Sequence, residues 1–523
     1  MSTARTLARA GLIVSGFFLV SRLLGFVRAV VVLNTFHPGA ELDAFFAAFR
    51  LPDLMFQLVA AGALSSALIP VLSGLLGRGR QDAAWRVATS VTNLMLIGLA
   101  VIALIVFLIA PWLIPIITPG FDEAGWARTI DLTRIMLLSP IFLAIGSVTG
   151  SILNARGRFA ASAIAPIVYN LAIIGGAVFL APTMGVTGLA VAVVAGSVLH
   201  LLVQVPAVWN VGYRHSATID LSDPSTRTAL ALVGPRALGL GVTQITFVVL
   251  TSLATLVGVG AVTAFNTAFT LLQIPIGVIG VPLGIVVLPS LSREAALGNR
   301  VEFAALVSRA IRLLTFVMIP ITGIAIVLRR ETVEVLFGFG GFDAAAIELS
   351  AATLLGFLPG LLAHALIAVL ARAFYAQQDT WTPVGAAILA VAINTTLGVL
   401  LVGPLGLPGL AVAIAVAAWI EAGVLFVVLH RRVPELDIAP IIELGLRTIV
   451  ISVIACAAAA AVSIGFASTF GAESSRLGLV VRLAVSSAVW LAVLVAAALA
   501  LRIGELRSIV GVMVDALRRP RPS

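Results

Sequence analysis

Long apolar runs follow one another along almost the whole chain, separated by short segments that carry arginine, glycine or proline. About fourteen of them reach the roughly 20 residues that an α-helix needs to cross a bilayer. Strands of an outer-membrane barrel would instead alternate apolar and polar residues over short segments. We therefore predict an all-α integral membrane protein with about fourteen transmembrane helices. The runs lie near residues 10–33, 43–76, 84–110, 128–153, 160–181, 187–209, 229–257, 260–291, 305–328, 346–371, 383–402, 408–429, 447–469 and 480–502.

The composition agrees with a polytopic membrane protein. Hydrophobic residues make up 61% of the 523 positions and charged residues only 11%, and the mean hydropathy is +1.16. A soluble protein of this length could not hide so much apolar surface. The first run is too long for a cleaved signal peptide and contains Arg22 and Arg28.

The net charge of +9 comes entirely from arginine, because the chain has no lysine. Arginines gather before the first span and after even-numbered spans, whereas odd-numbered connections carry few besides Arg329, Arg330 and Arg476. This positive-inside pattern predicts that both termini are cytoplasmic and that the 111–127 connection is outside. The basic charge is thus a topology signal and not a nucleic-acid site. The clusters are Arg5, Arg9, Arg78, Arg80, Arg86, Arg156, Arg158, Arg214, Arg227, Arg293, Arg300, Arg431 and Arg432, with Arg518, Arg519 and Arg521 at the end of the chain.

Several kinds of chemistry are excluded by what the sequence lacks. Cys456 is the only cysteine, so no disulfide forms within the chain, and the five histidines are scattered without metal-ligand spacing. Without lysine there is no Walker A loop, and no catalytic triad stands out. We expect neither an enzyme nor a bound cofactor or metal.

An internal repeat predicts the architecture. GLAVA at 188–192 returns at 409–413, IPVLSG at 69–74 returns as LPSLSR at 288–293, and GSILNARGRF at 150–159 has a looser counterpart in ARAFYAQQDT at 371–380. The common offset of about 220 residues covers six spans, so the repeats are parallel, as in two-lobed transporters. We predict an N-terminal lobe at 1–215, a C-terminal lobe at 216–435, and at 436–523 two appended helices with a basic cytoplasmic tail.

Three arginines lie inside apolar runs, at Arg22, Arg28 and Arg50. An ionised side chain at the bilayer centre costs about 2.5–3.5 kcal/mol on the insertion scale, so it usually faces a cavity or a partner. Three cations around one cavity suit an anionic substrate. Arg28 is nearer the outer end of its span, where a long side chain can also reach the interface.

In the second span, Asp43, Arg50 and Gln57 are spaced by seven and share one helix stripe. Arg50 is either directed at the cavity or paired with Asp53, three residues later, in a packing role. Pro275, Pro282 and Pro289, with glycines between them, predict a bent and closely packed eighth span.

Asn170, His364, Asn394 and Glu421 are isolated polar residues in apolar spans. Such residues commonly form hydrogen bonds between helices. Glu421 is the best candidate for a coupling-ion or proton site, with Asn394 as a second coupling candidate.

Several segments resemble the MurJ/MviN family of lipid II flippases, which belongs to the multidrug/oligosaccharidyl-lipid/polysaccharide exporter superfamily. The resemblance implies fourteen helices, two six-helix lobes and a cationic cavity for a lipid-linked diphosphate sugar, in a bacterial cell membrane. It runs from the first span to about the twelfth. The segments are SRLLGFVR at 21–28, ELDAFFAAFRLPDL at 41–54, GALSSALIPVLS at 62–73, TPGF at 118–121, SILNARGRFAASAIAPIVYN at 151–170, IGVIGVPLGIVVLPSLSR at 276–293 and RAFYAQQDTWTP at 372–383.

By this resemblance Arg22, Arg28 and Asp43 match family motif positions, and Arg50 falls where a basic residue is common. The chain departs from the family at an arginine pair, where it has Phe56 and Gln57, and at three further charged positions, where it has Ala61, Thr270 and Gln273. The sodium site of some relatives is not evident in the sequence.

The functional hypothesis is a flippase that moves a polyprenyl-diphosphate-linked peptidoglycan precursor, lipid II, to the outer leaflet by alternating access. Arg22, Arg28 and Arg50 would bind the diphosphate through charge-assisted hydrogen bonds, together with Asp43. Coupling would come from the membrane potential or an ion. The partners would be this substrate, membrane lipids and cell-wall synthesis proteins. Alternatives are export of another lipid-linked glycan or a drug, or a non-transporting scaffold for cell-wall synthesis.

Overall fold

The computed structural model describes residues 2–36, 38–59, 63–338, 342–470 and 476–506. Every regular element in these ranges is helical, and none is a strand. The basic tail with Arg518, Arg519 and Arg521 lies outside the described residues.

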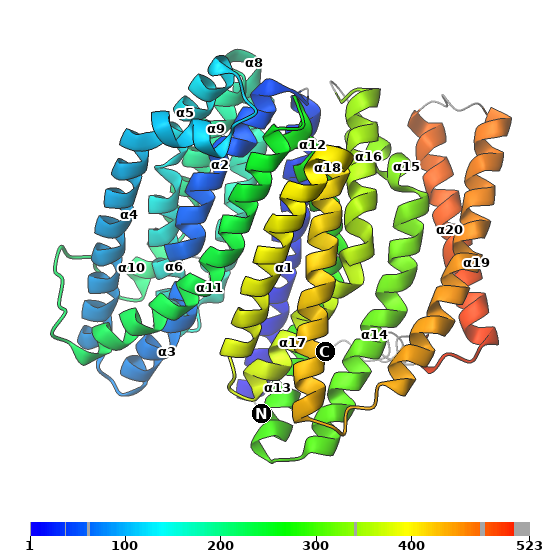
Figure 1. Ribbon diagram of the computed structural model, residues 1–523. Helices are drawn as coiled ribbons and strands as arrows, with labels where there is room; N and C mark the ends of the chain where they lie inside the picture. The colour runs from blue at the N-terminus through cyan, green and yellow to red at the C-terminus, as the bar shows by residue number, and fades with distance from the viewer. Residues whose placement is uncertain (1, 37, 60–62, 339–341, 471–475, 507–523) are drawn as a thin grey trace. The chain divides into compact units, whose positions relative to one another are not determined.

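Ten helical stretches of the described chain are long and apolar enough to cross a membrane, so the prediction of an all-α multi-span membrane protein is confirmed. The count of fourteen remains a prediction. One of the ten, α18 (Trp381–Arg432), has 52 residues and would be about 78 Å long if straight, against a hydrocarbon core of about 30 Å. Gly406 breaks it with φ 60° and ψ −141°, and Figure 1 shows α18 folding back on itself. The ten are Gln81–Ile117, Glu123–Ala155, Phe159–Met184, Val186–Asn210, Ala261–Ala296, Arg300–Val327, Ala344–Ala376, Trp381–Arg432, Ala439–Thr469 and Arg476–Ala500.

The described chain forms two compact units. Unit 1 comprises residues 1–266 with 340–343, and unit 2 the remainder. The division between the units falls inside one helix, α12. The helix before it, α11, packs on α2, α3 and α4 and belongs to unit 1. The predicted lobe limits at 215 and 435 describe the sequence repeat and stay a prediction. The helices of unit 1 are α1 (Ser2–Thr35), α2 (Ala40–Val59), α3 (Ala63–Gly77), α4 (Gln81–Ile117), α5 (Glu123–Met136), α6 (Ser139–Ala155), α7 (Phe159–Gly175), the π-helix η1 (Gly176–Leu180), α8 (Ala181–Met184), α9 (Val186–Leu202), α10 (Val205–Asn210) and α11 (Pro224–Thr255), with the first turns of α12 (Ala261–Pro275).

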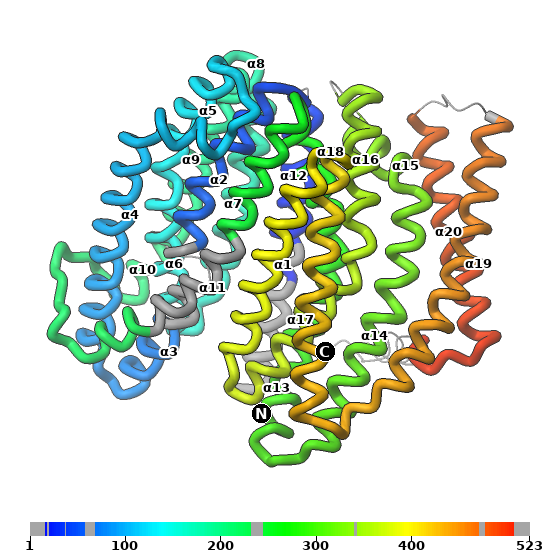
Figure 2. Tube along the Cα trace, viewed as in Figure 1, coloured from blue at the N-terminus to red at the C-terminus, as the bar shows by residue number. Residues whose placement is uncertain are grey.

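Unit 2 begins within α12 and ends with two helices that run side by side, α19 and α20 (Figures 1 and 2). Of these, α19 also packs on α14. The helices that follow α12 are the π-helix η2 (Ile276–Gly280), α13 (Val281–Ala296), α14 (Arg300–Val327), α15 (Arg329–Phe337), α16 (Ala344–Phe357), the 3₁₀-helix η3 (Leu358–Gly360), α17 (Leu361–Ala376), α18, α19 (Ala439–Phe470) and α20 (Arg476–Ala500).

The proline-rich eighth span contains a π-helix between its first two prolines, and the predicted bend stays a prediction. Pro275 ends α12, the π-helix η2 follows, and Pro282 is the second residue of α13. A π-turn is a frequent cause of helix bending. Glycine is required at Gly284, because a Cβ there would lie 2.8 Å from the backbone oxygen of Ala368 in α17. The prediction of close packing is therefore confirmed at this position.

The backbone repeats at the predicted offset. Gly185 has φ 57° and ψ −145° before α9, and Gly406 has φ 60° and ψ −141° within α18. These positions are 221 residues apart. The turn after α6 likewise matches the turn after α17, with φ 70° at Gly157 and φ 62° at Gln378. The two units thus contain the same local structure at corresponding places.

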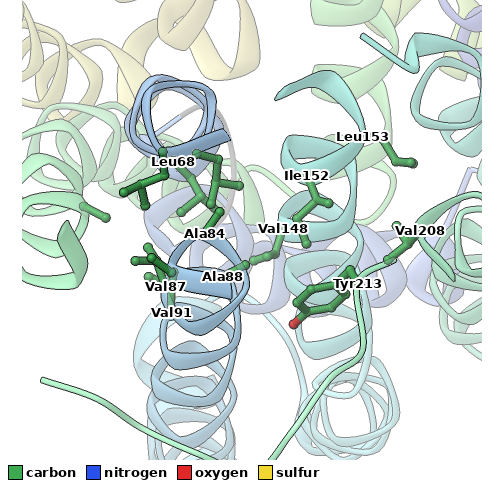
Figure 3. Close-up of a cluster of buried hydrophobic side chains, with 14 residues drawn as sticks. Leu68, Ala84, Val87, Ala88, Val91, Val148, Ile152, Leu153, Val208 and Tyr213 are labelled. Atoms are coloured by element: carbon green, nitrogen blue, oxygen red, sulfur yellow. The ribbon is translucent and has the colours of Figure 1, made fainter. Parts of the chain in front are cut away.

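Corresponding apolar clusters lie next to the turns at Gly157 and Gln378. In unit 1, Leu72, Ala84 and Leu153 are buried in one cluster together with Tyr213 (Figure 3). Tyr213 shares a hydrogen bond of 3.2 Å with Thr89 through their hydroxyl oxygens. In unit 2 the counterpart cluster contains the three residues at the matching repeat positions, Leu291, Phe303 and Phe374.

A nearly buried ionic network ties the last two helices to α15. Arg482 of α20 donates from Nη2 to Oε1 of Glu331 at 2.7 Å, and from Nε to the hydroxyl of Ser463 in α19 at 2.8 Å. The Arg482 and Glu331 side chains are only 16% and 13% exposed. Because each charge is desolvated, the loss of one partner strands the other.

We expect Glu331→Ala to destabilise the protein by about 2–3 kcal/mol, somewhat below the usual cost of breaking a fully buried ion pair. The double change Glu331→Leu/Arg482→Leu should recover most of this loss. Glu348→Ala, which removes a partner that is 64% exposed, is the matched control. Thermal unfolding of the detergent-purified variants measures the effect. A Glu331→Ala protein as stable as the control would refute it.

Candidate functional site

Asp43 lies at the start of α2 and is fully buried. Its Oδ2 accepts from the backbone N–H of Gly260 at 2.6 Å. Its Oδ1 accepts from the backbone N–H of Thr263 at 2.8 Å and from the Thr263 hydroxyl at 2.6 Å. The carboxylate therefore caps the N-terminus of α12 from a neighbouring helix, which satisfies donors that a helix cannot satisfy within itself. Both oxygens are occupied by the protein.

Arg50 lies two turns further along α2 and connects it to α11 and α12. Its Nε donates to the hydroxyl of Thr251 at 2.8 Å, and its Nη2 donates to Oδ1 of Asn266 at 2.7 Å. The guanidinium also lies over the ring of Phe247, 5.6 Å from its centroid. A direct pair with Asp53 was one of the two alternatives that the sequence left open for Arg50, beside a side chain directed at the cavity. The structure instead places these hydrogen bonds on two other helices, with Asp53 as an electrostatic neighbour.

The carboxylate of Asp53 lies within electrostatic range of two cations, Arg50 and Arg28. Arg28 is half-buried on α1 and also interacts electrostatically with Tyr169 of α7. Gln57 donates from Nε2 to Oδ1 of Asp53 at 3.5 Å. Unit 1 thus brings two of the predicted arginines around a single acid. Such an arrangement leaves excess positive charge for an anion.

Arg22 lies on the same helix, α1, and its side chain is exposed. Nearby, Asn170 of α7 donates from Nδ2 to the backbone oxygen of Ser21 at 3.4 Å and to that of Pro166 at 3.0 Å. The expected role of Asn170 in bonding between helices is confirmed. This contact fixes α1 against α7 next to Arg22.

The coupling candidates lie in unit 2, on the two arms of α18, which are the parts before and after the break at Gly406. Asn394 is 5% exposed, and its Oδ1 is buried without a hydrogen-bond partner. Glu421 is half-buried and interacts electrostatically with Tyr375, which also interacts with Arg372 of α17. His364 of α17 is another polar side chain whose Nε2 is buried without a partner.

Two departures from the family pattern, Phe56 and Gln57, lie next to Asp53 in α2 and alter its surroundings. Phe56 packs against an apolar cluster that includes Met55 and Leu99, and Gln57 hydrogen-bonds Asp53. An arginine pair is thereby replaced by packing and by a neutral donor. Within the described ranges, no group of three or more His, Cys, Asp or Glu residues could hold a metal ion.

Sequence reasoning missed the partners of the charged residues. Thr251, Thr263 and Asn266 each bind a charge of α2 from more than 200 positions away. Asn266 could have been noticed as a polar residue in an apolar span. Threonine gives no such signal, because it is common inside membrane helices.

Comparisons with known proteins agree with the family resemblance of the sequence motifs. The family model described as Lipid II flippase MurJ matches residues 32–499. The chain is 32% identical over 435 residues to the Lipid II flippase MurJ of Burkholderia cenocepacia, covering 82% of this chain and 84% of the relative. It is 34% identical to the Probable lipid II flippase MurJ of Rhizobium tropici, with 82% and 81% covered.

Solved structures share the fold. A structure of lipid II flippase MurJ in an inward closed conformation superposes with a TM-score of 0.76 at 21% identity, covering 92% of this chain and 98% of that chain. An inward-facing multidrug resistance transporter of the MATE family has a TM-score of 0.69 at 19% identity, with 79% and 95% covered.

We expect Asp43→Ala to lower the stability of the protein by about 2 kcal/mol, near the upper end for a lost helix cap, because donors at the start of α12 become unsatisfied. Asp43→Asn should also destabilise, since one carboxylate oxygen becomes an NH₂ group facing an N–H donor. Asp131→Ala, at an exposed position of α5, is the control. Thermal unfolding tests this; an Asp43→Asn variant equal to the parent would contradict it.

Proposed function

Because this chain belongs to the lipid II flippase MurJ family, it is a transporter and not an enzyme, and we propose how it handles its substrate. It is a multi-span protein of the bacterial inner membrane that moves lipid II, a lipid-linked substrate. The observation behind the proposal is the gathering of Arg28 and Arg50 around Asp53 inside an apolar unit.

The substrate-binding group of unit 1 is assigned to Arg28 and Arg22 on α1. A guanidinium presents a planar fork of donors that matches phosphate oxygens, so two arginines suit a diphosphate. In the absence of substrate, Asp53 offsets one of the two positive charges of Arg28 and Arg50. A bound diphosphate would then replace Asp53 as the main counter-ion of Arg28.

Arg50 and Asp43 are assigned to positioning. The hydrogen bonds of Arg50 to Thr251 and Asn266 and its position over Phe247 hold its guanidinium in place. It therefore contributes its charge to the site from a fixed position. Asp43, whose oxygens both accept hydrogen bonds from α12, fixes the start of that helix and does not touch the substrate.

Coupling is assigned first to the membrane potential. Moving one negative charge outward from a negative cytoplasm gains about 2.3 kcal/mol per 100 mV. Glu421 and Asn394 supply a further coupling site. By helical rise, Asn394 is about 20 Å from the start of α18 and Glu421 about 17 Å from its end, so the two arms carry them at similar depth.

Both termini are placed in the cytoplasm and the connection between α4 and α5 outside, from the distribution of arginine. Asp122 accepts a hydrogen bond from the Gly125 N–H at 2.8 Å and caps α5. Glu123 next to it is exposed and is a better site for a label.

The substrate role of Arg28 predicts that Arg28→Ala abolishes lipid II flipping at normal membrane abundance. Arg28→Lys should keep part of the activity, because lysine retains the charge but lacks the planar fork. The double change Arg28→Ala/Asp53→Ala separates the two roles of this charge. It stays inactive if Arg28 binds substrate, and it recovers if Arg28 only neutralises Asp53.

The measurements are growth rescue of a flippase-depleted strain and lipid II in each leaflet, scored beside protein level. Arg22→Ala is expected to behave like Arg28→Ala. Arg86→Ala, at an exposed position of α4, is the control and should rescue fully. Full rescue by Arg28→Ala would remove it from the binding group.

The topology predicts that Glu123→Cys, in a Cys456→Ala background, reacts with a membrane-impermeant maleimide in intact spheroplasts. An Arg300→Cys variant should react only after lysis, because the turn before α14 is placed in the cytoplasm. The reverse pattern would overturn the assigned orientation.

A further inference from the structure

A self-contained clamp closes the end of unit 1 at which α6 ends and α4 begins. Arg156 at the end of α6 donates from Nη2 to Oε1 of Gln81, the first residue of α4, at 2.6 Å. Its guanidinium also lies over the ring of Trp85, 5.3 Å from the centroid. The cation, the acceptor and the aromatic surface all come from the protein itself.

Unit 2 has the same backbone at the corresponding place but different side chains. The repeat puts Gln377 at the position of Arg156, Arg300 at that of Gln81 and Ala304 at that of Trp85. The end-of-helix dihedrals agree, with φ −91° and ψ 2° at Arg156 and φ −89° and ψ 10° at Gln377. In unit 2 the arginine is therefore at the start of the second helix and the amide at the end of the first, which is the reverse of unit 1. An alanine takes the place of the aromatic ring.

A cavity of about 670 Å³ lies at this place in unit 2. Arg300, Gln377, Glu294 and Arg432 are among its lining residues. The Nε2 atom of Gln377 is buried and has no acceptor. Where unit 1 pairs a donor with an acceptor, unit 2 presents the exposed guanidinium of Arg300 and a Gln377 amide nitrogen that lacks an acceptor.

The charged side chains around the cavity offset one another, so no excess negative charge opposes an anion. Arg432 is held by Asp379 at 2.6 Å, and Oε2 of Glu294 accepts from Nδ2 of Asn299 at 3.0 Å. Partial desolvation alone would raise the pKa of Asp379, but hydrogen bonds from Thr382 and Arg432 outweigh it and lower that pKa to about 2. The two acids therefore offset the two arginines. The Gln377 amide nitrogen is the buried donor left without an acceptor, and the guanidinium of Arg300, the first residue of the 28-residue helix α14, is exposed. The N–H of Glu302 in the first turn of α14 is already capped by Oδ1 of Asn299 at 3.3 Å.

We propose that this cavity binds a phosphodiester group. One phosphodiester carries one negative charge and several acceptor oxygens, which suits the Arg300 guanidinium and the Gln377 amide. The head groups of membrane lipids can supply this phosphodiester. Trp381, which begins α18 next to this turn, is 79% exposed, and exposed aromatic residues of this kind mark the bilayer interface. Basic pockets at the cytoplasmic surface are known to take lipid head groups. The site is independent of lipid II transport.

The test uses the full chain purified in detergent and titrated with dihexanoyl phosphatidylglycerol, with glycerophosphoglycerol as the head group alone. Arg300→Gln should weaken binding of the lipid by about tenfold, the loss expected for one charge-assisted hydrogen bond. The double swap Arg300→Gln/Gln377→Arg rebuilds the pair of unit 1. It should fold normally, close the site with an internal hydrogen bond and abolish binding.

Arg293→Gln, which removes an exposed arginine of α13 outside the cavity lining, is the matched control and should bind like the parent. If glycerophosphoglycerol competes with the lipid, a free phosphodiester is sufficient for binding. If it does not compete, the ligand is the whole lipid. Equal binding by the parent, Arg300→Gln and the double swap would overturn the proposal. Flipping by the double swap reports separately on transport, so that a failure here leaves the proposed function standing.

Discussion

The scarcity of water around these helices is the constraint on which the rest of the structure depends. A polar group inside an apolar span has no solvent partner, so another part of the protein must satisfy it. Asp43 is satisfied by the start of α12, Arg50 by Thr251 and Asn266, and Arg482 by Glu331 and Ser463. Each of these contacts joins different helices, so the few charged residues link helices that are separate in the sequence.

The same constraint explains why the sequence revealed the class of protein more readily than its contacts. Apolar runs and arginine clusters are local patterns, and they sufficed for a helical membrane protein built on a repeat. The positions of Arg28 and Arg50 were also visible, because a charge in an apolar run is conspicuous. What Arg50 binds was not visible, because Thr251 looks like any threonine of a membrane helix. Asp43 was placed with the substrate by family resemblance, although its neighbours use both of its oxygens.

The repeat separates what a backbone dictates from what side chains add. The turns at Gly157 and Gln378 have nearly the same φ, although a glutamine must adopt a left-handed conformation that glycine adopts freely. Around the same turn, one unit closes on Arg156 and the other leaves a cavity beside Gln377. Similar backbones can therefore carry an arginine paired within the protein in one unit and a cavity lined by charged residues in the other. Function follows these side chains and not the fold alone.

The matching glycine breaks at Gly185 and Gly406 also bear on how such a chain could have arisen. They mark the same point in two halves whose offset covers an even number of predicted crossings. A half with an even number of crossings begins and ends on the same side of the membrane. Two copies joined end to end would therefore insert in the same direction without any change in their flanking arginines. Duplication of an ancestral gene for a half-size protein would have yielded an insertable chain in a single event, after which the two copies could diverge in charge.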